Sequence, residues 1–135
     1  IKYSFNNINQ DTNSVSETFI LSSGSNFLKN EINCNLNGEF ASAFVNGIFS
    51  LIDNQHHEIR TTINHSTENT KSYQLIKSVL GKDSRAIYQG KIFVDSAAQK
   101  TDGYQLSKAI LLEETSEFNA KPELEIYADD VKCSH

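Results

Sequence analysis

Two residues at the end of the chain, Cys133 and His135, are the strongest candidates for chemistry in this 135-residue sequence. A thiolate and an imidazole are natural ligands for a soft or borderline transition metal. In a β-strand, positions i and i+2 point to the same side and lie roughly 6.6 Å apart. Because two ligands cannot complete a tetrahedral site, a metal held here needs donors from elsewhere. Without such donors the pair is a surface feature with no chemical role.

The stretch that leads to this pair alternates between apolar and polar residues. The apolar positions after Pro122 are Leu124, Ile126 and Ala128. The polar positions between them are Glu123, Glu125, Tyr127 and Asp129. Period-two alternation is typical of a strand with one buried face, so we predict a terminal strand that delivers Cys133 and His135.

The remaining cysteine and histidines have structural interpretations. Cys34 lies on the apolar side of an alternating run, where a free cysteine packs as a small hydrophobic side chain. His57 and the glutamate after it resemble the start of a zinc-protease motif, but Thr61 stands where that motif needs its second histidine. His65 falls on the apolar side of its strand and is interpreted as a hydrogen-bonded core histidine.

Composition limits the classes of function. The net charge of −5, with acids and bases interspersed, disfavours binding to nucleic acid. The longest apolar run, residues 109–112, is far too short to span a membrane. Two cysteines 99 positions apart give no disulfide framework, so we expect a reducing, cytoplasmic protein. The 135 residues suit one domain.

Short extended runs recur about every 10 to 14 residues, and long amphipathic helices are missing. The expected strands cover residues 2–5, 17–21, 31–36, 40–52, 57–65, 72–80, 85–88, 91–94, 104–112 and 117–120, followed by the terminal strand. A polar loop is expected over 6–16, and breaks are expected at Asn46-Gly47 and Gln89-Gly90. This pattern is compatible with a sandwich, a barrel or a parallel β-helix.

A coarse recurrence helps to choose between these folds. The apolar centres near His65, Tyr88 and Leu111 are 23 positions apart, which is the scale of one solenoid coil. The sequence also contains 14 asparagines, and asparagine-rich turns suit stacked coils in which like residues form ladders. The spacing alone leaves the sandwich and the β-helix equally open.

The terminal run KPELEIYADDVKCSH, residues 121–135, closely resembles the signature of the SufB/SufD family of iron–sulfur cluster assembly proteins, on the SufD side. Three further segments match in order: NTKSYQ (69–74), RAIYQGKIFV (85–94) and AQKTDGYQ (98–105). The resemblance implies a right-handed parallel β-helix. Residues 1–135 would then be one truncated β-helix core domain, lacking the helical segment that follows it in the family and binds the ATPase.

The resemblance implies a non-catalytic scaffold subunit of the SufBCD complex, which builds and transfers nascent iron–sulfur clusters. His135 would be a cluster or metal ligand shared with a SufB-like subunit, and Cys133 an accessory thiol. The residues expected at that subunit interface are Glu125, Tyr127, Asp129 and Lys132. The cluster would be transient and absent from this fragment, and a SufC-type ATPase would bind through the missing segment.

Several alternatives stay open at this point. The SufB branch fits less well, because its sulfur-accepting cysteine has no counterpart between Thr70 and Lys132. A carbohydrate-acting β-helix would need aromatic platforms, yet the chain has no Trp. A passive structural solenoid would leave Cys133 and His135 idle. For any truncated solenoid, the exposed coil edges make self-association a hazard.

Overall fold

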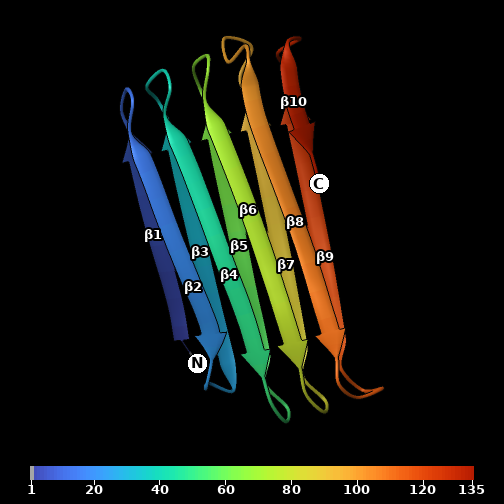
Figure 1. The fold of residues 1–135 in the computed structure, drawn as a ribbon. Helices are drawn as coiled ribbons and strands as arrows, with labels where there is room; N and C mark the ends of the chain where they lie inside the picture. The colour runs from blue at the N-terminus through green and yellow to red at the C-terminus, as the bar shows by residue number, and fades with distance from the viewer. Residues whose placement is uncertain (1) are drawn as a thin grey trace.

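The computed structural model describes residues 2–135 and consists of ten β-strands with no helix (Figure 1). Alternation of inward and outward side chains runs through the central strands, as β5 shows with five buried residues at every second position. The strands are β1 (Lys2–Gln10), β2 (Val15–Ser23), β3 (Phe27–Leu36), β4 (Ser42–Leu51), β5 (His56–His65), β6 (Lys71–Leu80), β7 (Arg85–Val94), β8 (Thr101–Leu111), β9 (Glu117–Ile126) and β10 (Val131–Ser134).

The strands form two stacked five-stranded sheets, with the chain passing from one to the other at every turn (Figure 1). The odd sheet has the order β1-β3-β5-β7-β9, and the even sheet has the order β10-β8-β6-β4-β2. Every strand pairs in parallel with the strand two places along the chain. The fold is therefore the expected parallel β-helix, with one strand of each sheet in every coil.

Each coil is longer than the recurrence in the sequence suggests. In the odd sheet, Phe27 of β3 pairs with His56 of β5, and His56 pairs in turn with Arg85 of β7. Successive pairs in these central coils are therefore equally spaced along the chain. The step is shorter between β1 and β3 and longer between β7 and β9, so the end coils differ in length from the central ones.

The expected recurrence was wrong because its three centres are not register partners. His65 pairs with Val94 at the end of β7, not with Tyr88 in the middle of that strand. Leu111 lies in β8, which belongs to the even sheet. Equal spacing along the sequence thus linked positions that do not stack on one another.

Two expected strand breaks do not occur. Strand β4 runs straight through Asn46-Gly47, and β7 runs through Gln89-Gly90. Both glycines face the interior, where a missing side chain makes room for neighbours: Ile76 approaches Gly47, and Tyr88 and Gln105 fill the space at Gly90. A glycine in a strand therefore marks a close approach here rather than a turn.

The terminal region is divided differently from the expected single strand. Strand β9 already contains Pro122, and a bend at residues 127–130 separates it from the short β10. Pro122 lies within β9 and is the register partner of Gly90 in β7. As a result, Leu124 and Cys133 belong to opposite sheets.

The turns between sheets use residues with a positive φ, and most of them have short polar side chains. Asn13, Asn54, Asn69 and Asp83 have φ between 55° and 60°. Asparagine and aspartate tolerate this left-handed conformation better than other non-glycine residues. Tight corners of this kind carry the chain from one sheet to the other over a short stretch.

The like-residue ladder expected for turns lies on the strands instead, along the outer face of the odd sheet. Asn33 donates to Asn7 at 2.6 Å, and Asn35 donates to Asn9 at 2.8 Å. Asn64 continues the ladder by donating to Asn35 at 2.8 Å. This ladder keeps residues 6–10 in β1, so the polar loop expected over 6–16 shrinks to a turn at 11–14.

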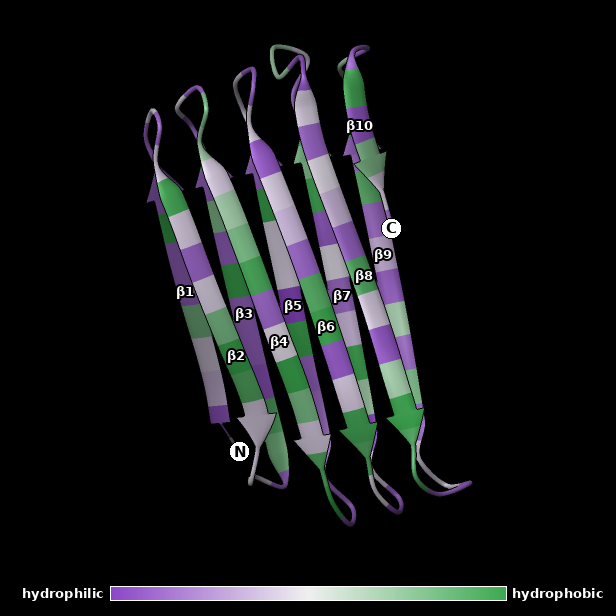
Figure 2. Ribbon diagram, viewed as in Figure 1, coloured by the Kyte–Doolittle hydropathy of each residue, from purple (hydrophilic) through white to green (hydrophobic). Residues whose placement is uncertain are grey.

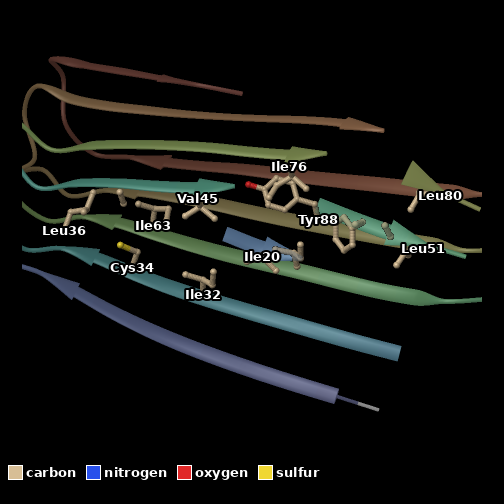
Figure 3. Packing of buried hydrophobic residues seen from close by; sticks show 14 of the residues in the cluster. Ile20, Ile32, Cys34, Leu36, Val45, Leu51, Ile63, Ile76, Leu80 and Tyr88 are labelled. Atoms are coloured by element: carbon tan, nitrogen blue, oxygen red, sulfur yellow. The ribbon is translucent and has the colours of Figure 1, made fainter. Parts of the chain in front are cut away.

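The core lies between the sheets and is apolar through most coils (Figure 3). Its largest fully buried apolar side chains include Phe49, Ile32, Leu36, Ile59, Ile63 and Ile76. A second, smaller cluster near the last coil contains Ile92, Val94, Ala98 and Ala128. Hydropathy alternates along the strands in the same way in the ribbon view (Figure 2). Residues 2–135 contain no helix long and apolar enough to cross a membrane.

Candidate functional site

Cys133 faces the interior at the C-terminal end of the solenoid. In β10 it pairs with Gly103 of β8, and its Sγ would lie 3.5 Å from a Cβ built on that glycine. The thiol is partly buried and packs against the second cluster near Ile92. Burial raises the pKa of the Cys133 thiol, while a hydrogen bond from the Gly103 backbone partly offsets this. The thiol is thus protonated at neutral pH unless a metal or a cation stabilises the thiolate.

His135 follows directly after β10 and is exposed. It lines an open cavity of about 360 Å³ at the end of the solenoid. The other walls come from both sheets: Tyr88 and Ala120 from the odd sheet, and Gln105 and Ser107 from the even sheet. The exposed imidazole thus lies next to a cavity whose walls combine both sheets.

Of the two candidate ligands, only Cys133 lies within β10; its side chain is partly buried, and His135 lies just beyond the strand and is exposed. No group of three His, Cys, Asp or Glu residues that could hold a metal ion occurs within residues 2–135. The two donor types suit iron or an iron–sulfur centre, which accept thiolate and imidazole ligands. Their number does not suffice for a closed site on this part of the chain.

The four residues predicted at a subunit interface lie near this end, and two of them, Glu125 and Tyr127, already have partners within the chain. Glu125 accepts a hydrogen bond from Tyr127 at 3.1 Å and pairs with Lys91 at 2.7 Å. The hydrogen bond from Lys91 lowers the pKa of the Glu125 carboxyl. Tyr127, Asp129 and Lys132 are exposed.

A buried polar network next to the cavity was not expected from the sequence. Thr61 donates to Oε1 of Gln74 at 2.6 Å, and Tyr88 donates to Oε1 of Gln105 at 2.9 Å. Gln105 in turn donates to the Gly90 carbonyl at 3.0 Å. Burial raises the pKa of Tyr88 to about 12, so the phenol stays neutral. The sequence carried one signal for this network: glutamines stand at inward-facing positions of strands, and a glycine stands at an inward-facing position nearby.

The interpretation of His65 and Cys34 as core residues is confirmed. His65 is fully buried and has both ring nitrogens in hydrogen bonds, to Thr70 at 2.8 Å and to Ser72 at 2.9 Å. Burial lowers its pKa to about 4. Cys34 is buried in the main cluster, and burial raises the pKa of its thiol to about 11.

Together, the two parallel sheets and the turns between them define the protein as a parallel β-solenoid, with the candidate ligands Cys133 and His135 at its C-terminal end. The comparison with known families then identifies the family. A model described as SUF system FeS cluster assembly, SufBD core domain, matches residues 1–135. The chain belongs to this SufBD core family.

Individual relatives agree with this assignment. The chain is similar to the iron–sulfur cluster assembly protein SufD of Escherichia coli, with 36% identity over 126 residues. That match covers 93% of this chain and 29% of the relative. It is also 44% identical over 62 residues to an iron–sulfur cluster assembly SufBD family protein of Synechocystis sp., covering 46% of this chain and 14% of the relative. The chain thus spans less than a third of the length of these curated relatives.

Proposed function

We propose that the chain is the β-helical core of a SufD-like, non-catalytic scaffold subunit of the SUF iron–sulfur cluster assembly complex. The family supports a role in cluster assembly, and the relative covering most of the chain carries the name SufD. In this proposal the subunit pairs with a SufB-like protein through the C-terminal part of the β-helix. A SufC-type ATPase binds through a helical segment outside residues 1–135.

The observation that supports the proposal is the position of two candidate ligands at the C-terminal end of the solenoid, the exposed His135 and the partly buried Cys133. His135 offers a free imidazole, and Cys133 offers a thiol just inside it. The cluster is the cargo of this site, and its remaining ligands come from the SufB-like subunit. The thiol has a raised pKa, so Cys133 serves as an accessory ligand that needs the metal to lose its proton.

The subunit interface includes the exposed residues near the same end. Tyr127, Asp129 and Lys132 are exposed, and Glu125 keeps its pairing with Lys91. Both cysteines are free thiols, which suits a reducing cytoplasmic compartment.

The test is co-purification of the full-length protein with its SufB- and SufC-like partners, followed by anaerobic counting of iron and sulfide. We expect His135→Ala to lower cluster content severalfold while the complex stays intact. His56→Ala serves as the matched control, because His56 is exposed on the outer face of β5. Unchanged iron and sulfide in the His135 variant would contradict the role of His135, and loss of the complex itself would make this strand an interface element only.

A further inference from the structure

The two outer faces of the solenoid differ in chemistry. The outer face of the odd sheet carries every ion pair found within residues 2–135, including Arg60–Glu31 at 3.3 Å, Lys91–Glu125 at 2.7 Å and Arg85–Glu117 at 3.6 Å. The outer face of the even sheet has none in this part of the chain. An interspersed set of paired charges suits contact with water, so the odd face is the solvated one.

The outer face of the even sheet is apolar over neighbouring strands. One row of the register contains Glu17, Phe44, Tyr73 and Tyr104, and the two tyrosine rings stack at 5.0 Å between centroids. The next row contains Phe19, Asn46, Leu75 and Leu106. Phe19 remains 65% exposed. The exposed apolar side chains on this face include Phe19, Leu21, Tyr73, Val79 and Ile110. A concentration of exposed apolar residues on one face marks an interaction site more often than scattered ones do.

Two neighbouring lysines on this face have no acidic neighbour in their row, whereas Lys71 lies beside Asp102 and the remaining acid, Glu17, lies beside Phe44. Lys77 of β6 and Lys108 of β8 are direct neighbours in the register, one row beyond Leu75 and Leu106. Neither forms an ion pair within residues 2–135, although the chain as a whole carries a net charge of −5. Like charges at paired positions repel each other, so a carboxylate from outside would stabilise both.

The backbone limits the conformation of the occupant. Strands β4 and β6 already pair along both edges, so their N–H and C=O groups are used within the sheet. A polypeptide that lies on this face must satisfy its own backbone hydrogen bonds, which an α-helix does internally. A membrane surface also combines apolar and anionic groups, but recognition of it uses clusters of four to eight basic residues. A pair of lysines favours a protein.

We propose that the outer face of the even sheet docks an amphipathic α-helix of a partner protein. Its apolar stripe covers Phe19, Tyr73 and Leu75, and acidic residues beside that stripe pair with Lys77 and Lys108. The docking surface lies outside the sheet, whereas Cys133 faces the interior. The inference therefore goes beyond cluster assembly and does not depend on it.

Photo-crosslinking in living cells tests the proposal on the full-length protein. The photoreactive amino acid p-benzoylphenylalanine replaces Phe19 or Tyr73, and mass spectrometry sequences the crosslinked peptide. Phe5 provides the matched control, because it is 55% exposed on the outer face of the odd sheet. We expect the photoreactive residue on the even face to crosslink to a peptide of another protein. That peptide should have apolar residues at i, i+3 and i+4, bordered by Asp or Glu. The photoreactive residue at position 5 should not capture it.

Charge reversal supplies the second arm. The double variant Lys77→Glu and Lys108→Glu should lower the crosslink yield about tenfold, because complementary charges across an interface become repulsive. Lys121→Glu on the odd face should leave the yield unchanged, and thermal melting checks that each variant is folded. Capture of lipid, of a second copy or of the same chain would overturn the proposal. The proposal would also be overturned if no crosslink formed, or if the crosslink yield were the same in the charge-reversed variant as in the parent protein.

Discussion

The hydroxyl of Tyr88 donates a hydrogen bond to Oε1 of Gln105 at 2.9 Å, joining the two sheets through the interior of the solenoid. The bond exists because Gly90, two residues along β7, leaves its side-chain space empty for both groups. It lies beside the cavity that His135 lines. The end of the solenoid that carries the candidate ligands is therefore braced by buried polar contacts, and its stability can be tested residue by residue.

Replacing Gly90 should destabilise the protein. A Cβ at this position would collide with both Gln105 Oε1 and the Tyr88 hydroxyl, so one of them must move away from its partner. We expect Gly90→Ala to lower the free energy of unfolding by about 1–3 kcal/mol, as overpacking does in well-packed interiors. Urea unfolding followed by circular dichroism measures this. Gly103→Ala is the control, because its Cβ would meet neighbours only at 3.4–3.5 Å; an equal loss in both variants would contradict the explanation.

Removing the Tyr88 hydroxyl should also cost stability without changing the packing of the ring. Tyr88→Phe leaves Gln105 Oε1 without its donor in a buried site, and an unsatisfied buried acceptor costs about 1–3 kcal/mol. The measurement is the urea midpoint at constant m-value. Tyr127→Phe removes an exposed hydroxyl and should change the midpoint little. Similar shifts of the urea midpoint in the two variants would show that the buried hydrogen bond stabilises the protein no more than the exposed hydroxyl does.

His65 should make stability fall in mild acid. Its pKa lies near 4 in the folded protein, below the ordinary value of 6.5, because burial disfavours the charged ring. Between pH 6.5 and 4 the unfolded chain therefore binds a proton that the folded chain does not, and stability is lost as the pH falls through this window. The full effect is about 3 kcal/mol.

The measurement for His65 is urea unfolding at several pH values between 4.5 and 7.5. The variant His65→Gln should unfold more easily at pH 7 and show a flatter pH dependence. His56→Gln alters an exposed ring and should keep the slope of the parent protein. If His65→Gln shows the same pH dependence of stability as the parent protein, the acid sensitivity comes from groups other than His65.

The two thiols should differ in reactivity. Cys34 is 1% exposed and has a pKa of about 11, whereas Cys133 is only partly buried. We expect iodoacetamide at pH 8 to label Cys133 at least tenfold faster in the native protein, since its thiol is more accessible than that of Cys34. Peptide mass spectrometry follows each site over time. Equal labelling in urea is the control, and equal labelling of the native protein would contradict the burial of Cys34.

Much of this structure could be predicted locally. Alternation alone placed His65 and Cys34 in the core, because successive side chains of a strand point to opposite faces. Residue types alone singled out Cys133 and His135 as possible ligands. The motifs 69–74, 85–94 and 98–105 identified the family that the comparisons confirm.

The tertiary structure decided the features that depend on residues one coil apart in the chain. Coil length, the continuity of β4 through Gly47 and the asparagine ladder all follow from which positions pair in the stacked coils. Gly90 looks like a turn signal in isolation, yet in the solenoid it opens the space in which Tyr88 and Gln105 meet. Local sequence cannot specify such partners, because the same residue types permit several registers until the two sheets close on a shared core.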